Sequence, residues 1–472
     1  MSLINTLALW LTKGRRNGAV SGNHTFEDRA PSPSRESTPR SISATSSSFP
    51  RFRATAGDQL GSLAESAYAR TRMKLLESFT PAQPVSDRRR FAGRLDTLTA
   101  IIRAIEEQRL HVVVYGERGL GKTSVMHVLT QAARDARYLV IYVSCGADSN
   151  FDEVFRTVAA HIPMLFHGAV GPTSPDVEKG KTLADTLPKS PISPRVASDI
   201  LAKIVGTRVV VVLDEFDRSA SDAFRQNVAE LIKNLSDRLV RVQLVIAGVA
   251  GNLTELLEHI PSIQRNIFAL QVPWMSAAEI HQLIHNGGTL AGLTFDKDAG
   301  DAIVFAAHGS PYLATLLCHH AGLSALDKTR TRVNKSDVLA SIGIAVLEFQ
   351  GRIPARVRTL IKTYVDQQKM PYLGMVAGAS LLSNGAFRKV DLLESTVSSN
   401  IPGPLEDVLA ELIKAELLVE TTVKDARLYR FSEDGIAPYL WLLSRESALR
   451  DAISPQPSAT PRLSFSQEKI QS

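Results

Sequence analysis

Five short apolar runs alternate with segments of helical periodicity in the middle of this 472-residue chain. The runs are almost continuous in Val, Ile and Leu, and they cover residues 111–115, 138–143, 208–213, 242–247 and 267–272. Strands that are apolar at nearly every position are covered on both faces, and their alternation with helices is typical of βαβ units. The sequence therefore predicts an α/β fold built on a parallel sheet.

Composition adds a few limits. The hydrophobic fraction of 44% and the charged fraction of 22% are near the averages for globular proteins. No apolar run approaches the roughly 20 residues that cross a bilayer, so we expect no transmembrane span. Cys145 and Cys318 are the only cysteines. They are too few for a disulfide framework and are not spaced as metal ligands, which indicates a reducing compartment, the cytoplasm.

Both ends of the chain differ from its middle. The first 90 residues carry 14 basic and 7 acidic side chains, so the rest is near neutral although the formal net charge is +6. Residues 31–50 contain 8 Ser, 2 Thr and 4 Pro, and residues 454–472 are again rich in Pro and Ser. Such segments lack the apolar groups that form a core. We predict disordered tails over residues 1–85 and 447–472, the first of them basic.

A short apolar patch at residues 3–11 is followed by Lys13, Arg15 and Arg16. The charges follow the patch, which is the reverse of the order in a secretory signal. A frayed terminus is the reading we favour. The alternative is a helix that contacts a membrane surface or docks on a partner.

The first apolar run leads directly into a glycine-rich segment that fits the pattern G-x-x-x-x-G-K-S/T. Between a strand and a helix, this pattern is typical of a P-loop, whose main-chain amides and helix N-terminus bind phosphates. A simple glycine-rich turn is the alternative. The candidate nucleotide-binding residues are Gly116, Glu117, Arg118, Gly119, Leu120, Gly121, Lys122, Thr123 and Ser124. Lys122 is expected to reach the β- and γ-phosphates, and Thr123 to give its hydroxyl to Mg²⁺.

The third apolar run ends in three carboxylates within four residues, Asp214, Glu215 and Asp217. At the end of a strand beside the P-loop, Asp214 is a candidate Mg²⁺ ligand and Glu215 a candidate general base for hydrolysis. Asp217 is interpreted as the cap of the next helix, with a role in the site as the alternative. Lys122 and Asp214 are 92 residues apart, which leaves room for an intervening strand, as in the ASCE class of P-loop ATPases.

With both motifs, the chain resembles AAA+ and STAND ATPases, particularly the bacterial and archaeal group related to origin-recognition initiators. Phe91-Ala-Gly-Arg94 resembles that group's F-x-G-R box, which implies that Phe91 and Arg94 lie near the adenine. The resemblance makes Asn252 a candidate γ-phosphate sensor, with a simple turn residue as the alternative. It makes Arg265 a candidate arginine finger for a neighbouring subunit, with a solvated surface charge as the alternative.

Helical periodicity over residues 273–349 predicts a lid after the P-loop domain of residues 86–272. Gly309-Ser310-Pro311 resembles the G-x-P element of STAND proteins, in which the proline lies near the adenine. A helix-start turn is a compatible interpretation. The chain departs from initiators because Tyr312 stands where they place a sensor arginine. It also departs from STAND signalling proteins, because no C-terminal repeat array follows.

Residues 350–446 are predicted to contain helices at 354–366, 372–382 and 404–417, then a hairpin of 418–423 and 428–431 that turns at Lys424-Asp425. This order is expected of a winged helix. The helix at the recognition position carries Glu406, Asp407, Glu411 and Glu416 against Lys414, a poor match to a phosphate-lined groove. We therefore favour a domain that packs on the ATPase and binds protein. A backbone contact with DNA through Arg356, Arg358, Lys362, Arg427 and Arg430 is the alternative.

The sequence as a whole predicts an ATP-binding and ATP-hydrolysing, Mg²⁺-dependent switch that works on a protein partner or by self-association. An initiator-like or transposition-helper ATPase that binds DNA is the runner-up, and a nucleotide-binding scaffold without turnover is disfavoured by the presence of Glu215. In the ATP state, we expect the sensor loop, lid and winged helix to be drawn together.

Overall fold

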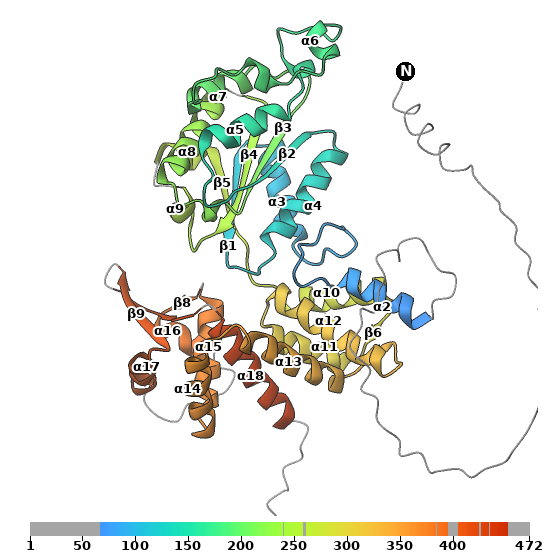
Figure 1. Cartoon of the computed structure of the whole chain (residues 1–472), viewed down its shortest axis with the longest axis vertical. Coiled ribbons are helices and arrows are strands. Elements are labelled where there is room, and N and C mark those ends of the chain that lie inside the picture. Colours follow the sequence, from blue (N-terminus) through green and yellow to red (C-terminus); the bar gives the residue numbers. More distant parts are fainter. Residues whose placement is uncertain are drawn as a thin grey trace, which may run out of the picture. The chain divides into compact units, whose positions relative to one another are not determined.

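A computed structural model of the chain describes residues 67–238, 240–257, 261–383, 385–394, 405–423, 426–433 and 435–451 (Figure 1). The predictions for the N-terminal apolar patch, the Ser-rich segment 31–50, the hairpin turn at Lys424-Asp425 and the tail 454–472 lie outside these residues. The chain divides into two units, Met1–Leu63 and Ala64–Ser472. All of the structure described below belongs to the second unit.

The five predicted strands form one parallel sheet, which confirms the α/β prediction. The strands are β1 (His111–Gly116), β2 (Leu139–Ser144), β3 (Val209–Asp214), β4 (Val242–Val249) and β5 (Ile267–Gln271). Their order in the sheet is β2-β3-β4-β1-β5. Because all strands are parallel, the carboxyl ends of β1, β3 and β4 lie at the same edge. This edge carries both phosphate-related motifs.

Side chains alternate between the two faces of the sheet, as strand geometry requires. In β3, Val210 and Val212 belong to one core, which they share with α3 (Leu95–Glu106) and α4 (Lys122–Asp135). The alternate residues Val209, Val211 and Leu213 belong to a second core. Helices α5 (Phe151–Ala160), α7 (Pro194–Leu201) and α8 (Asp222–Asp237) cover that second face. Both faces are therefore buried, which explains why the strands are apolar at nearly every position.

Short elements connect these layers. Residues 168–194, an insertion between α5 and α7, contain α6 (Pro175–Glu178) and the 3₁₀ turn η3 (Leu183–Thr186), with η2 (Met164–Phe166) just before them. After β3 and β4 come η4 (Phe216–Arg218) and α9 (Leu253–Leu256), and η5 (Pro261–Asn266) precedes β5. An isolated bridge from Pro163 to Thr182 ties the insertion to the domain, and a second, from His167 to Ile204, joins the residues that flank it.

Four helices follow the sheet, and we call them the lid helices. They are α10 (Ala277–Ala291), α11 (Lys297–Ala307), α12 (Pro311–Asp327) and α13 (Lys335–Gln350). The helical periodicity predicted over residues 273–349 is interrupted by two short strands, because β6 (Thr294–Phe295) and β7 (Arg332–Val333) form a parallel pair. At two residues each, these strands are too short to produce a recognisable apolar run.

The prediction that residues 1–85 are disordered was wrong for residues 67–78, which form helix α2 (Ala67–Ser78). Its Leu75 is fully buried, and Phe79 just beyond it is 1% exposed. A Cβ at Gly287 of α10 would lie 2.3 Å from the Phe79 ring, and one at Gly322 of α12 would lie 2.7 Å from Leu75. Glycines more than 200 residues away thus make room for this segment, which local composition does not reveal.

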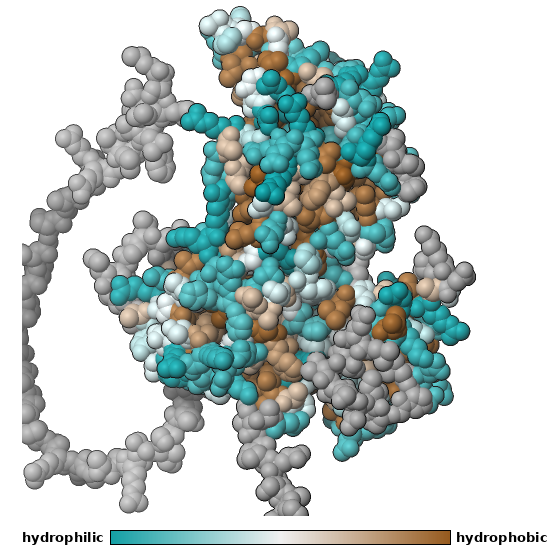
Figure 2. Space-filling view, turned by 180° about the vertical axis from the view of Figure 1, so that it is seen from behind, coloured by the Kyte–Doolittle hydropathy of each residue, from teal (hydrophilic) through white to brown (hydrophobic). Residues whose placement is uncertain are grey.

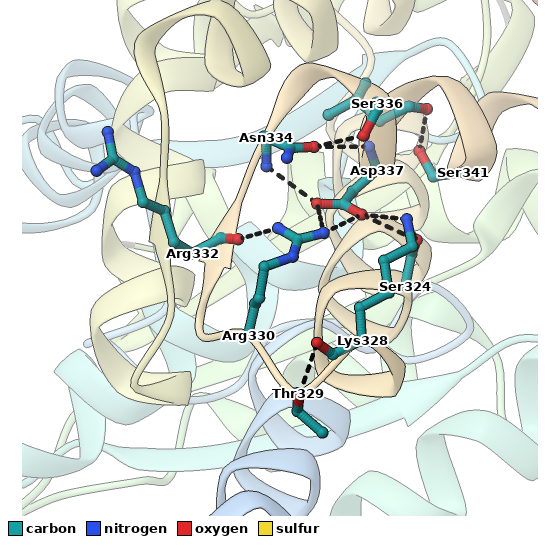
Figure 3. Close-up of polar contacts among 10 residues, drawn as sticks. Ser324, Lys328, Thr329, Arg330, Arg332, Asn334, Ser336, Asp337 and Ser341 are labelled. Carbon is teal, nitrogen blue, oxygen red and sulfur yellow. Dashed lines mark hydrogen bonds and ion pairs between the residues drawn. The ribbon is translucent and has the colours of Figure 1, made fainter.

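A buried carboxylate joins α12 to α13 (Figure 3). Asp337 has no exposed surface. It accepts hydrogen bonds from Lys328 Nζ at 2.8 Å, from Arg330 Nη2 at 2.9 Å and from the Asn334 amide at 3.1 Å. Burial alone would raise the pKa of Asp337, but these hydrogen bonds together hold the pKa below its usual value. The charged carboxylate therefore ties down the turn between the two lid helices.

A C-terminal segment follows the lid helices. It comprises α14 (Ala355–Asp366), α15 (Met370–Leu382), α16 (Lys389–Glu394), α17 (Leu405–Lys414) and α18 (Ile436–Asp451), with strands β8 (Ala386–Phe387), β9 (Leu418–Val423) and β10 (Ala426–Phe431). The three antiparallel strands have the order β8-β10-β9. The predicted helices and hairpin are present, while the assignment as a winged helix stays a prediction.

The surface shows hydrophobic residues in separate patches between larger hydrophilic areas on the face drawn in Figure 2. Within the residues that the structure describes, no helix is both long and apolar enough to cross a membrane. The apolar residues of the chain are mainly accounted for by the two sheet cores and the helical core of the lid and C-terminal segment.

Candidate functional site

The P-loop begins where β1 ends, and its shape depends on glycine. Gly116, Gly119 and Gly121 have φ values of 142°, 83° and 82°, in the region that other residues rarely adopt. A Cβ at Gly116 would also lie 3.1 Å from the Val272 carbonyl oxygen. Helix α4 starts directly after Gly121, which provides no side-chain cap. Amides in the first turn are therefore left without a capping side chain, and such amides bind anions well.

Lys122 lies within this loop and is 8% exposed. Its Nζ donates to the carbonyl oxygens of Gly116 at 2.9 Å and Glu117 at 2.5 Å. Burial lowers the pKa of Lys122 to about 8, against the opposing effect of the nearby Asp217 and Asp214 carboxylates. A buried ammonium group that donates to two neutral main-chain carbonyls is suited to an anionic ligand. The loop therefore fits the phosphates of a nucleotide.

Asp214 ends β3 and is 3% exposed. Its Oδ1 accepts a hydrogen bond from the Glu215 amide at 2.8 Å, and its Oδ2 accepts one from the Tyr142 hydroxyl. Thr123 is half-buried in the first turn of α4. A hydroxyl and a carboxylate are hard oxygen ligands of the kind Mg²⁺ prefers. These two residues are the ones that would hold the metal.

Glu215 follows Asp214 with a left-handed backbone, φ 53°. Its Oε2 accepts from Arg218 Nη1 at 2.9 Å and from Ser144 Oγ at 3.1 Å. The hydrogen bond from Arg218 is the main reason that the pKa of Glu215 lies below its usual value, and Ser144 contributes in the same direction. The side chain is 43% exposed. Glu215 is therefore a solvent-accessible carboxylate at neutral pH.

Asp217 has a structural contact that differs from the predicted one. Its Oδ1 accepts a hydrogen bond from the Val249 amide at 2.8 Å. The cap of α8 is Ser221 instead, whose hydroxyl accepts from the Phe224 amide at 3.2 Å. Asp217 thus ties the turn after β3 to the end of β4, so the prediction of a helix cap was wrong.

Asn252 and Arg265 lie after β4 and before β5. Asn252 caps the short helix α9, since its Oδ1 accepts from the Glu255 amide at 3.2 Å and its Nδ2 donates to Glu255 Oε1 at 2.8 Å. Arg265 is exposed in η5. The contacts of Asn252 match the alternative of a turn residue. The sensor and arginine-finger roles stay predictions.

The Phe91 to Arg94 segment lies between the P-loop and α10. Arg94 is 5% exposed, and its Nη2 donates to the Leu120 carbonyl at 3.4 Å. The amides of Gly93 and Arg94 donate to Gln282 Oε1 and Glu279 Oε1, each at 3.1 Å. Among the described residues, Arg94 Nε and Nη1 have no hydrogen-bond partner. A buried guanidinium beside the loop, with two donors that lack a partner, is suited to donate hydrogen bonds to acceptors of a bound nucleotide.

Ser124 was predicted to bind nucleotide, but its hydroxyl has another partner. Ser124 Oγ accepts a hydrogen bond from the Val85 amide at 2.9 Å. This contact holds the segment before Phe91 against the first turn of α4. Ser124 therefore anchors this segment, and its role in nucleotide binding stays a prediction.

The lid approaches the P-loop at the turn before α12. His308 and Gly309 have φ values of 49° and 77°, and Ser310 caps α12 by accepting from the Leu313 amide at 3.3 Å. A Cβ at Gly121 would lie 3.9 Å from Pro311 Cγ, and one at Gly119 would lie 3.6 Å from Tyr312 Cβ. The turn thus starts a helix, as one interpretation predicted, and also lies beside the loop.

Several residues of the site were missed in the sequence. Tyr142, Ser144 and Arg218 contact the two carboxylates that follow β3. Tyr142 is a strand residue within an apolar run, so only its register against β3 identifies it. Arg218 is three residues after Glu215, and this spacing was the one local indication that the two side chains could pair.

Comparison with known proteins agrees with this geometry. Residues 90–246 match the family model of the AAA ATPase domain. No curated protein sequence matches the chain. Residues 90–246 therefore form a P-loop domain of the AAA ATPase type, as predicted.

Solved structures with similar folds include Cdc6p from Pyrobaculum aerophilum, with 13% identity and a TM-score of 0.42 over 80% of this chain and 99% of that one. The RuvB Holliday junction branch migration motor of Thermotoga maritima has 18% identity and a TM-score of 0.39 over 74% and 95%. The ORC1 protein of Aeropyrum pernix, in complex with DNA, has 16% identity and a TM-score of 0.40 over 81% and 98%.

Proposed function

We propose that this protein binds and hydrolyses ATP and uses the nucleotide state to control the contact of its C-terminal segment with a partner. One observation carries the proposal. The turn from His308 to Tyr312 lies beside the P-loop on one side, and its His308 ring packs on Trp441 of helix α18 on the other. A change at the phosphates therefore has a direct route to the C-terminal segment.

The residues of the loop have separate roles in this proposal. Lys122 and the amides around Gly119 and Gly121 bind the phosphates, and Arg94, Phe91 and Pro311 lie at the adenine end. Thr123 and Asp214 hold Mg²⁺, which would neutralise charge that develops on the phosphate oxygens. Glu215 accepts a proton from the attacking water and orients it, as a general base does.

The second side of the turn is an aromatic contact with α18. Trp441 is 1% exposed, and its Nε1 donates to the Ala306 carbonyl at 2.8 Å. Its ring lies 4.1 Å from the His308 ring, centre to centre. The Arg445 guanidinium lies 3.6 Å from the centre of the Trp441 ring. This cation–π and aromatic stack joins α18 to the end of α11, immediately before the turn that meets the P-loop.

We expect Trp441→Phe to weaken this coupling while leaving ATP affinity within about twofold of wild type, because no P-loop contact changes and the lost hydrogen bond is worth only about 1 kcal/mol. In the wild type, hydrogen exchange of α18 should differ between the ATP and ADP states. In Trp441→Phe, we expect this difference to shrink at least about twofold. Hydrogen exchange read by mass spectrometry measures both.

Ser447→Ala, on an exposed position of α18, is the control and should keep the wild-type difference. If α18 of the wild type exchanges equally with ATP and with ADP, the proposed switch is wrong.

A protein partner or a second copy of the chain is favoured over DNA by the charges of the C-terminal segment. Several of its basic side chains pair with acidic ones nearby: Arg356 with Glu416 at 2.7 Å, Lys369 with Glu411 at 2.6 Å, Arg427 with Glu420 at 3.5 Å, and Lys389 with Glu406. A cation that is already paired releases fewer counterions from a phosphate backbone. The helix at the predicted recognition position, α17, also carries the acidic residues Glu406, Asp407 and Glu411.

We expect duplex DNA to bind weakly to the full chain. Non-specific affinity should lie in the range of about 10⁻⁴ to 10⁻⁶ M at physiological salt and fall steeply between about 50 and 200 mM salt. Fluorescence anisotropy at both salt concentrations, with and without ATP, measures this. Nanomolar, ATP-dependent binding that survives physiological salt would overturn the preference and favour a DNA-binding initiator or transposition helper.

A further inference from the structure

Tyr142 lies on β2, the edge strand beside β3. The two strands pair in register, with Tyr142 opposite Val212 and Ser144 opposite Asp214. Tyr142 packs in the core shared with α3 and α4, as do Val210 and Val212. Because side chains alternate along a strand, Asp214 also faces that side of the sheet. Tyr142 and Asp214 are therefore on the face that carries the P-loop helix.

Two contacts hold the Tyr142 side chain in place. Its hydroxyl donates a hydrogen bond to Asp214 Oδ2. Its ring stacks on the imidazole of His127, with ring centres 5.1 Å apart and planes 8° from parallel. His127 belongs to α4, whose first residue is Lys122. The phenol therefore connects the P-loop helix with the carboxylate at the end of β3.

The second oxygen of the Asp214 carboxylate also has a protein donor. Its Oδ1 accepts a hydrogen bond from the Glu215 amide at 2.8 Å. Each carboxylate oxygen thus has one protein donor, so the plane of the Asp214 carboxylate is set by these two contacts.

We propose that Tyr142 is a positioning residue, whose hydroxyl fixes the Asp214 carboxylate in the orientation that binds Mg²⁺ beside the nucleotide. This inference rests on the proposed function, because it gives Asp214 the metal-binding role. Groups that hydrogen-bond a metal ligand set its orientation, and their loss typically costs about 10- to 100-fold in metal affinity or activity. A carboxylate that keeps only the amide contact would be free to rotate away from the metal.

The test uses Tyr142→Phe in the full chain, which removes the hydroxyl and keeps the ring that stacks on His127. Manganese binding to the protein–ADP complex, followed by electron paramagnetic resonance, should be about tenfold weaker than in the wild type. Affinity for ATP without metal should stay within about twofold, because the loop and Lys122 are untouched. The Mg²⁺ concentration that half-saturates hydrolysis should rise by a similar factor of about ten.

Tyr138→Phe is the matched control. Tyr138 packs in the same core, but its hydroxyl contacts Glu106 and Arg208, each at 3.3 Å, and not Asp214. It should keep wild-type metal affinity. Equal manganese affinity in Tyr142→Phe and the wild type would overturn the proposal, as would an equal loss in Tyr138→Phe.

A double-mutant cycle guards against a general loss of structure. If Tyr142 acts through Asp214, Tyr142→Phe should cause no further loss of manganese affinity in an Asp214→Asn background. Additive losses would overturn the proposal. Manganese binding also separates this inference from the proposed function. A wild type that binds the metal with ADP but never hydrolyses ATP would refute the ATPase. The role of Tyr142 would still be tested by comparing the manganese affinity of Tyr142→Phe with that of the wild type.

Discussion

Lys122→Ala is expected to weaken ATP binding about 100-fold or more. The lysine would make charge-assisted hydrogen bonds to the phosphates, each worth about 1.5–3 kcal/mol, and about 1.4 kcal/mol corresponds to a tenfold change in affinity. The present acceptors of Lys122 Nζ, the Gly116 and Glu117 carbonyls, show that the ammonium group is already directed into the loop. Equilibrium binding of a fluorescent ATP analogue measures the loss.

The same lysine predicts a pH dependence. Burial lowers the pKa of Lys122 to about 8, and a neighbouring phosphate would raise it, because an opposite charge favours the charged form. Binding should therefore take up a proton, and wild-type affinity should fall as the pH rises above about 8. This fall should be missing in Lys122→Ala, which has no group to titrate.

Lys233→Ala, at an exposed position of α8, provides the control and should bind ATP like the wild type. Tight ATP binding by Lys122→Ala would remove the basis of the phosphate site and of every role assigned around it.

Glu215→Gln should lower the rate of ATP hydrolysis by about 10²- to 10⁴-fold, the usual contribution of a general base. ATP binding should be retained, because the amide has the same shape and Glu215 lies outside the P-loop. The low pKa of Glu215, caused first by the hydrogen bond from Arg218, keeps the wild-type carboxylate ionised well below neutral pH. Phosphate release under saturating ATP, with binding measured in parallel, gives both quantities.

Glu230→Gln makes the same chemical change at an exposed position of α8, outside the motif, and serves as the control. It should hydrolyse ATP at the wild-type rate. Undiminished turnover in Glu215→Gln would exclude this residue as the base, and another group would then have to orient the water.

The sheet was predictable because its determinants are local. Each strand is an almost continuous apolar run, and the ends of the strands lie within two residues of the predicted runs. The phosphate motif was predictable for the same reason, since Gly116, Gly119 and Gly121 supply the backbone angles that the loop needs within six residues. Helix α2 was not predictable, because it depends on Gly287 and Gly322, which lie far away in the sequence.

The residues of the site also divide into those that local sequence predicts and those that only the tertiary structure identifies. Lys122, Asp214 and Glu215 follow from contiguous motifs. Tyr142 contacts Asp214 across 72 residues, and Val85 contacts Ser124 across 39. The position of Asp217 in the chain suggested a helix cap, but its oxygen meets the Val249 amide 32 residues later. These partners depend on strand register and on how loops meet, which no local pattern encodes.

The amino-acid sequence by itself determined an α/β phosphate-binding unit, because such a unit needs particular residues at fixed short spacings. Only the tertiary structure decided which neighbours orient the carboxylates and how the lid turn meets both the P-loop and Trp441. Hydrogen bonds and stacking need atoms within a few ångströms of one another, and chain folding alone brings distant residues that close.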